Sequence, residues 1–136
     1  MWIFSTLGFI SVVALSDEEG SDLLVRGRDA NSVNAVVDGV ALFLDDDADD
    51  LIVNDPAYEN LATDYPHRVR VPREAFCQWL AHDIREYLSY TNFKNAVSES
   101  LGEPFTSVTH KVWADALALT APEDVDFGYG YARMFA

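Results

Sequence analysis

Two runs of apolar residues at the start of the chain have the length and composition of β-strands. Residues 2–7 and 9–15 are rich in β-branched and aromatic side chains, which favour extended backbone. Gly8 stands between them and can adopt the positive φ of a tight reversal, so the pattern predicts a β-hairpin. After a polar turn at residues 16–22, a third short strand is expected at residues 23–27.

The next stretch has the periodicity of an amphipathic helix. Between residues 33 and 44, apolar side chains recur at the i, i+3, i+4, i+7 spacing that places them on one helix face. Asp29 or Asn31 is positioned to cap the first turn. Gly39 is expected to weaken this helix by about 1 kcal/mol relative to Ala. The apolar positions are Val33, Val36, Val37, Val40, Ala41 and Leu44.

An acidic run, DDDADD at residues 45–50, follows this helix. The helix is expected to end before it, because the negative end of the helix dipole disfavours carboxylates. A strand is predicted at residues 51–53 and a surface loop over residues 54–66, where Pro and Asn recur. Residues 67–71, HRVRV, alternate polar and apolar side chains, which indicates a strand with one solvated face.

Three helical patterns occupy residues 72–117. The first has a continuous apolar stripe between residues 76 and 88, and two shorter helices are expected over residues 92–102 and after residue 104. The boundary signals are Pro72, Glu74, Thr91 or Asn92, Gly102 and Pro104. The stripe of the first helix consists of Phe76, Trp79, Leu80, Ile84, Tyr87 and Leu88.

This order of elements predicts an α+β domain over residues 1–120. An antiparallel sheet of the ferredoxin-like kind, opened by the N-terminal hairpin and covered on one face by helices, is the economical packing of these elements. Residues 121–136 form a Gly/Tyr-rich C-terminal tail beyond that domain. The tail is expected either to order against a partner or to fold back on its own sheet.

Composition supports a single folded domain. The chain has 136 residues, of which 49% are hydrophobic and 12% aromatic, enough for a packed core despite a net charge of −14. The lone Cys77 cannot form an internal disulfide, which fits a reducing cytosol. The apolar N-terminal run has no preceding Lys or Arg and is too short to span a bilayer, so a strand of a cytoplasmic protein is expected there rather than a signal peptide.

The negative charge is concentrated in the first half of the chain. Residues 1–64 contain 14 acidic and 2 basic residues, for −12, whereas residues 65–136 contain 9 acidic and 7 basic residues, for −2. A surface crowded with one sign of charge attracts cationic protein surfaces and repels nucleic acids and anionic membranes. Neither nucleic acid nor membrane is therefore expected as a direct partner. The basic residues Arg68, Arg70, Arg73 and Arg85 are expected to pair with acids of the chain itself.

The residues that most often perform catalysis are few and unfavourably spaced. Cys77 and His82 lie five apart on one predicted helix, which turns their side chains away from each other. Cys77 is expected to be semi-buried, like most free cysteines, and His67 and His110 are expected at the surface or an edge. No phosphate-binding, zinc-protease or redox motif is present, so no catalytic residue and no cofactor are predicted.

The acidic run partly imitates a calcium-binding loop. Asp45, Asp47 and Asp49 have the spacing of the first three ligands, but that loop needs Gly at its sixth position and Glu at its twelfth. Asp50 and Pro56 occupy those positions here. No specific metal site is therefore predicted.

Several segments resemble a family of small, mostly uncharacterised bacterial and phage-borne proteins. These segments are the opening MWIFSTLGFISVV, the junction LLVRGRD, and the later DYPHRVRV and YTNFK. Members of the family usually begin with Met-Trp-aliphatic-Phe followed by Gly-Phe and Ser-Val-Val, and carry Tyr-x-Asn-Phe-Lys after the main helix. The matching positions are Trp2, Phe4, Gly8, Phe9, Ser11, Val12, Val13, Tyr90, Asn92, Phe93 and Lys94. The resemblance covers most of residues 1–117 and implies no activity; the acidic run and the tail depart from it.

These features favour a non-enzymatic interaction protein whose acidic half occupies a basic, nucleic-acid-binding surface of another protein. The strategy resembles that of the nucleic-acid-mimicking inhibitors that phages deploy against restriction and CRISPR systems. The alternative is a housekeeping domain of a halophilic or GC-rich organism, whose acidity serves solubility; an enzyme is the least favoured reading, and a homodimer fits either of the first two. The expected partner-binding residues are Asp45, Asp46, Asp47, Asp49, Asp50, Asp55, Glu59, Tyr129 and Tyr131.

Overall fold

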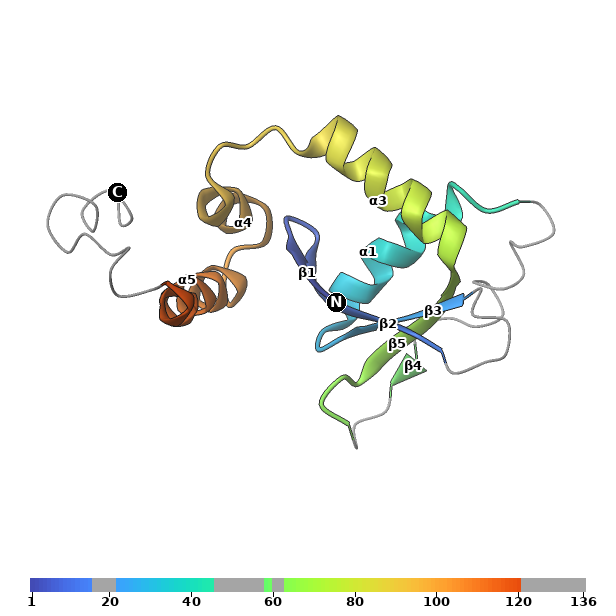
Figure 1. Ribbon diagram of the computed structural model, residues 1–136, viewed down its shortest axis with the longest axis horizontal. Helices are drawn as coiled ribbons and strands as arrows, with labels where there is room; N and C mark the ends of the chain where they lie inside the picture. Colours follow the sequence, from blue (N-terminus) through green and yellow to red (C-terminus); the bar gives the residue numbers. More distant parts are fainter. Residues whose placement is uncertain (16–21, 46–57, 60–62, 121–136) are drawn as a thin grey trace, which may run out of the picture.

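A computed structural model describes residues 1–15, 22–45, 58–59 and 63–120 (Figure 1). An antiparallel sheet has the strand order β1-β2-β3-β5-β4. The strands are β1 (Trp2–Ser5), β2 (Gly8–Ala14), β3 (Asp22–Gly27), β4 (Tyr58–Glu59) and β5 (His67–Pro72). The helices are α1 (Ala30–Ala41), α3 (Arg73–Tyr87), α4 (Phe93–Leu101) and α5 (Phe105–Ala116), followed by the 3-10 turn η1 (Leu117–Leu119). The predicted α+β class with an antiparallel sheet is confirmed.

The N-terminal hairpin forms as predicted, although Thr6 and Leu7 make its turn and Gly8 is the first residue of β2. Glycine is needed at this position for two reasons. Its φ of 137° lies in the region that side chains disfavour. A Cβ atom at this position would also lie 1.9 Å from the hydroxyl oxygen of Ser32 in α1. The same hydroxyl accepts a hydrogen bond of 3.1 Å from the backbone N–H of Phe9. The turn of the hairpin is therefore fixed by the first turn of the helix.

The core lies between the sheet and the helices α1 and α3. In the strand register, Val25 of β3 lies opposite Val12 of β2 on one side and Val69 of β5 on the other. These three valines are 5% exposed or less, because alternate residues of each strand face the same side of the sheet. Figure 1 shows α1 and α3 on that side, and their residues Val36 and Phe76 are buried in the same core.

Gly39 is the point at which α3 packs against α1. A Cβ atom on Gly39 would lie 2.0 Å from the indole nitrogen of Trp79, and Trp79 is only 7% exposed. The missing side chain, which sequence reasoning treats only as a loss of helix propensity, therefore makes room for the largest aromatic residue of the core.

Most predicted helix boundaries agree with the structure to within a residue or two, although α1 ends at Ala41, three residues before Leu44, the last apolar position of its predicted face. Asp29 caps α1 by accepting a hydrogen bond of 2.9 Å from the N–H of Ser32, and Asn92 caps α4 through the N–H of Asn95 at 3.0 Å. α1 ends before the acidic run, as expected. Pro72 lies immediately before α3 rather than inside its first turn.

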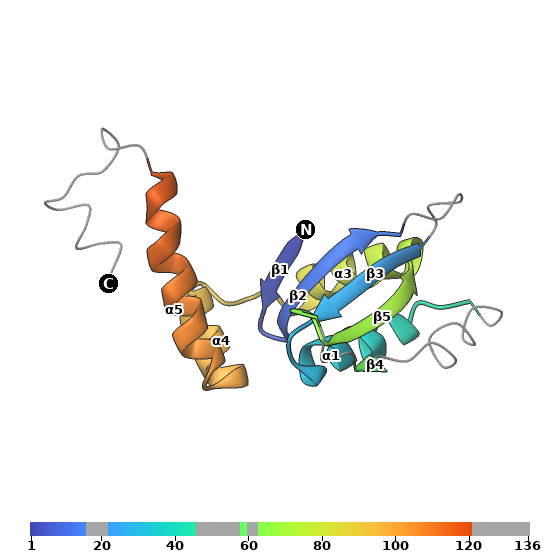
Figure 2. The same ribbon diagram turned by 90° about the horizontal axis from the view of Figure 1, so that it is seen from below.

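The helices α4 and α5 form a separate pair beyond β1, as Figures 1 and 2 both show. The ring of Phe93 meets the ring of Phe4 edge-on, with centroids 5.6 Å apart. Within the pair, the ammonium group of Lys94 lies 4.3 Å from the centroid of the Trp113 ring. A packing of all the helices on one face is therefore not confirmed. The chain order, with three strands before the first helix, does not confirm a ferredoxin-like topology either.

Two further expectations are modified by the structure. The segment 54–66, expected as loop, contains the two-residue strand β4, and the strand expected at residues 51–53 lies outside the described residues. The C-terminal half of the α3 stripe is not core: Ile84, Tyr87 and Leu88 are 52%, 67% and 51% exposed. α3 thus extends beyond the sheet that buries its first half.

No helix within the described residues has both the length and the apolar composition needed to cross a bilayer.

Replacing Gly39 by Ala should lower the free energy of unfolding by about 1 to 3 kcal/mol, because the new methyl group overpacks the contact with Trp79. Helix propensity alone would give the opposite sign, a gain of about 1 kcal/mol. Asn34→Ala, at an exposed position of the same helix, tests propensity without the steric contact and should be neutral or slightly stabilising. Urea denaturation of both variants measures the difference. A more stable Gly39→Ala variant would contradict the close packing of α1 and α3.

Candidate interaction surface

One end of the sheet holds the attachment points of an acid-rich connection. β2 ends at Ala14, which pairs with Leu23, and β3 begins at Asp22, which pairs with Pro72 at the end of β5. Residues 16–21 therefore connect two strand ends that lie side by side.

A second acid-rich connection begins at the same end. Asp45, just after α1, shares a surface hollow of about 110 Å³ with Pro72 and Glu74. Asp45 and Glu74 are both exposed. Because Pro72 also pairs with Asp22, residues 46–57 leave from the end of the sheet to which residues 16–21 are attached. We call this region the acidic end, defined by Asp22, Asp45, Glu74 and the two connections.

The charges of this region are almost all of one sign. Residues 16–21 contain three acidic residues and residues 46–57 contain five, with no basic residue in either segment. Asp22 is neutralised, since its carboxylate forms an ion pair of 2.6 Å with the guanidinium of Arg70. A second basic residue, Arg73, begins α3 directly after Pro72. At this end of the sheet, Asp45 and Glu74 are exposed carboxylates, and the two chain segments that begin there are acidic in sequence.

The structure places only part of the predicted site. Asp45 is at the acidic end and exposed. The backbone of Glu59 pairs with His67, at the opposite end of β5 from Pro72. Asp45 lies beside Pro72, so the structure places these two expected partner-binding residues at opposite ends of β5. The other expected partner-binding residues lie outside the described residues: Asp46, Asp47, Asp49, Asp50, Asp55, Tyr129 and Tyr131.

Arginines line the face of the sheet opposite the core. Arg26 pairs in register with Ser11 and with Arg68, and its Nη2 donates a hydrogen bond of 2.8 Å to the hydroxyl of Ser11. The Nε of Arg68 donates to the backbone carbonyl of Tyr65 at 3.1 Å. The expected pairing of arginines with the chain's own acids is thus confirmed for Arg70, whereas Arg68 binds main chain.

The candidate catalytic residues do not form a catalytic arrangement within the described part of the chain. Cys77 is exposed on α3, not semi-buried as expected, because it lies off the face of the helix that packs on the core. His82 is half-buried between the rings of Phe43 and Tyr87, whose centroids are 5.4 Å and 5.9 Å away. Among the described residues, no group of three His, Cys, Asp or Glu side chains is placed to hold a metal ion.

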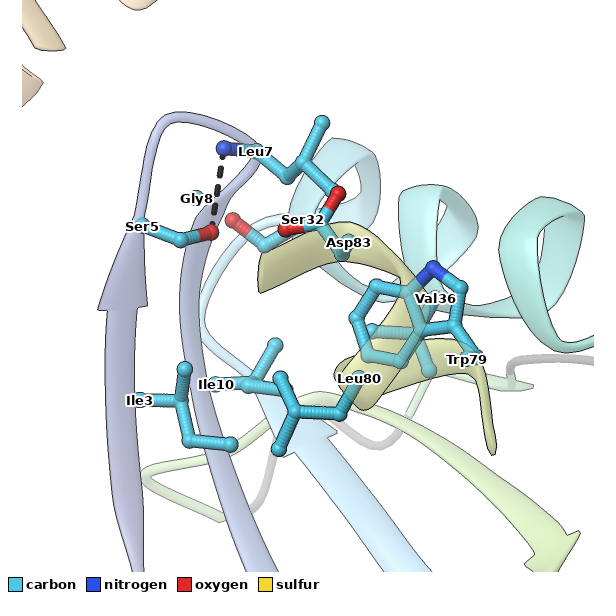
Figure 3. A pocket seen from close by; sticks show the side chains of 10 residues that line it. All are labelled: Ile3, Ser5, Leu7, Gly8, Ile10, Ser32, Val36, Trp79, Leu80 and Asp83. Carbon is cyan, nitrogen blue, oxygen red and sulfur yellow. Dashed lines mark hydrogen bonds between the residues drawn. The ribbon is translucent and has the colours of Figure 1, made fainter. Parts of the chain in front are cut away.

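A small cavity between the hairpin and α3 combines polar and apolar side chains (Figure 3). Ser5, Ser32 and Asp83 gather at one end of it. Its volume of about 20 Å³ is enough for about one water molecule and too small for a substrate. The hydroxyl of Ser32 is committed to structure, since it also donates a hydrogen bond of 2.7 Å to Asp29. Burial raises the pKa of the Asp83 carboxyl above its ordinary value of 3.8, and the charge of His82 partly offsets this effect.

Comparison of the chain with protein families, curated proteins and solved structures finds no match. The function proposed below therefore rests on the charge distribution and the geometry of the chain.

Replacing Asp83 by Asn should stabilise the protein at pH 7. The folded state binds a proton at Asp83 more tightly than the unfolded state does, so the contribution of this residue to stability falls as pH rises from 3.8 through the raised pKa. The gain in melting temperature should therefore shrink as the pH approaches 3.8. Asp115→Asn, at an exposed position of α5, controls for the loss of one negative charge. An equal gain for both variants at pH 7 would show that burial of Asp83 has no effect.

Proposed function

We propose that this chain is a non-enzymatic interaction protein that binds a basic surface of another protein through its acidic end. The observation that carries the proposal is the common attachment of the two acid-rich connections at one end of the sheet, next to Asp45 and Glu74. These two segments contain eight acidic residues; residues 16–21 are attached there at both ends, whereas residues 46–57 begin there and lead to β4.

The chemistry of such a region suits proteins that bind nucleic acids. Carboxylates engage Arg and Lys through charge-assisted hydrogen bonds, as phosphates do, and a concentrated negative field accelerates encounter with a basic groove. The ion pair between Asp22 and Arg70 links the side chains of β3 and β5, two strands that already pair at this end of the sheet. We infer that the protein competes with DNA or RNA for its partner, as phage-borne inhibitors of restriction and CRISPR complexes do, and that it meets this partner in the cytoplasm.

A second contact with the partner through the tail residues Tyr129 and Tyr131 remains a prediction from the sequence. Glu59 is less suited to the same contact, because β4 pairs with the end of β5 remote from Pro72. The proposal therefore depends on Asp45, Asp46, Asp47, Asp49 and Asp50, with Asp55 in the same connection.

A second candidate function, a domain whose acidity serves solubility at high salt, is favoured by acids elsewhere on the surface. Exposed carboxylates also occur along α1, α3, α4 and α5, outside the two acid-rich connections. The exposed acids away from the acidic end include Asp38, Asp64, Glu86, Glu99 and Asp115.

Neutralising the acidic run tests the interaction directly. In one variant Asp45, Asp46, Asp47, Asp49 and Asp50 become Asn; in the matched control, Asp38, Asp64 and Asp115 become Asn while Glu86 and Glu99 become Gln. Both variants lose five negative charges. The readout is displacement of a labelled duplex from a panel of purified nucleic-acid-binding proteins. Wild type and control should displace it, whereas the run variant should need at least about tenfold more protein, a loss of about 1.4 kcal/mol. Equal behaviour of the two variants would remove the acidic run from the mechanism.

Salt separates the two candidate functions. Raising ionic strength from 0.1 M to 1 M shortens the Debye length from about 10 Å to about 3 Å, so an electrostatic complex should weaken strongly. A protein adapted to high salt should instead gain stability. A melting temperature that climbs steeply with KCl, together with no duplex displacement at low salt, would support the solubility function and overturn the interaction.

A further inference from the structure

A cleft of about 550 Å³ is lined by residues of the N-terminal hairpin and of α5, and Asn31 in the first turn of α1 also contributes to it. Figure 2 shows the α4–α5 pair beside β1. Its volume is in the range of about 300 to 1,000 Å³ that is usual for sites that bind small molecules. The apolar walls consist of Trp2, Phe4 and Phe9 from the hairpin and Pro104, Phe105, Val108 and Val112 from the second helix pair.

The aromatic wall is ordered by ring contacts and yet is open to solvent. The ring of Phe9 lies 5.9 Å from that of Trp2 and 5.3 Å from that of Phe4, and the Trp2 contact is edge-on. Trp2 remains 72% exposed, and Val108 and Val112 on the facing helix are 44% and 53% exposed. Apolar side chains that face each other across an open cleft favour an occupant with an apolar body.

The rim of the cleft provides a cation. Arg28 is exposed, and its guanidinium lies 5.3 Å from the centroid of the Tyr65 ring, which is only 7% exposed. Asp29 also lines the cleft and keeps its negative charge, but its two carboxylate oxygens are directed to the first turn of α1, where they accept hydrogen bonds from the N–H and the hydroxyl of Ser32 at 2.9 Å and 2.7 Å. A guanidinium stacked on a buried ring, beside an apolar wall, is suited to an anion.

The position of this cation is supported by the residues behind it. The guanidinium of Arg26 lies 4.7 Å from the centroid of the same Tyr65 ring and is tied to the buried Ser11. Both arginines thus contact the ring of Tyr65, and this contact places the guanidinium of Arg28 near the cleft without a ligand. The cleft therefore offers one arginine to a ligand, whereas the acidic end offers the exposed carboxylates of Asp45 and Glu74.

We propose that the cleft binds a small aromatic anion, with its ring system between Trp2, Phe9 and Val108 and its acidic group on Arg28. The acidic group is a carboxylate, a sulfonate or a phosphate monoester, because each offers oxygen atoms to the two-pronged guanidinium. The inference uses different residues from the acidic end and does not depend on the proposed function.

Two fluorescent probes that share an apolar body test the proposal. 1-Anilinonaphthalene-8-sulfonate carries an acidic group, and N-phenyl-1-naphthylamine lacks it. Titrated into the full chain, the sulfonate should bind at one site per chain and more tightly than the neutral probe. Arg28→Gln should weaken the sulfonate by about tenfold and leave the neutral probe unchanged, whereas Arg28→Lys should retain part of the affinity.

Matched variants identify the site. Arg85→Gln removes one positive charge from an exposed position at the end of α3 and should leave sulfonate binding unchanged. Val108→Trp fills the cleft from an exposed position of α5 and should weaken both probes, with an unchanged melting temperature.

Three outcomes would overturn the proposal. If Arg28→Gln and Arg85→Gln weakened sulfonate binding equally, the loss would come from the change in net charge and not from the position of Arg28. Binding that survives Val108→Trp, or that involves several sites per chain, would place the probe elsewhere. Equal affinity for the charged and the neutral probe would show an apolar surface without selection for an anion.

Discussion

The hydroxyl of Ser32 joins the N-terminal hairpin to the first turn of α1. It is 2% exposed, donates to the carboxylate that caps α1, accepts from the N–H of Phe9, and occupies the space left by the absent side chain of Gly8. A buried polar group is costly unless its hydrogen bonds are satisfied, so this arrangement fixes the hairpin relative to the helix. Because side chains alternate along β2, Ile10 points into the core and Phe9 points to the opposite face, where the aromatic wall lies.

The sheet separates chemistry by its two faces and its two ends. Because side chains alternate along each strand, Val69 and Val71 close the core while Arg68 and Arg70 lie on the other face. Along the strands, both acid-rich connections begin near Pro72, whereas Arg26 and Arg28 contact Tyr65 at the other end, to which residues 46–57 lead through β4. One small domain thus presents opposite charges in different directions, which the net charge alone conceals.

Local signals predicted most of the fold. The valine spacing of α1, the Asp29 and Asn92 caps and the Gly8 turn depend on neighbouring residues in the sequence, and each is found where expected. Properties set by tertiary packing were missed. β4 depends on its partner β5 more than on its own two residues, the exposure of Ile84 depends on where the sheet ends beneath α3, and the role of Gly39 requires knowing that Trp79 packs over it. For the site, the sequence could only single out Asp45 as part of an acidic run. That Glu59 lies at the other end of β5 follows from the strand register, and the cleft follows from the placement of α5.

The attachment of the α4–α5 pair has a consequence for how the chain unfolds. The main core draws its buried residues from the sheet, α1 and α3, and within the described residues it includes none from α4 or α5. The pair has a small interior of its own at Val97 and Thr109, and its aromatic link to the sheet is the contact of Phe93 with Phe4. Elements with few shared buried contacts open as separate cooperative units, at a lower free energy than global unfolding. The chain is therefore built as one stable folding unit with a less stable helical unit beside it, and the cleft is formed where the two units meet.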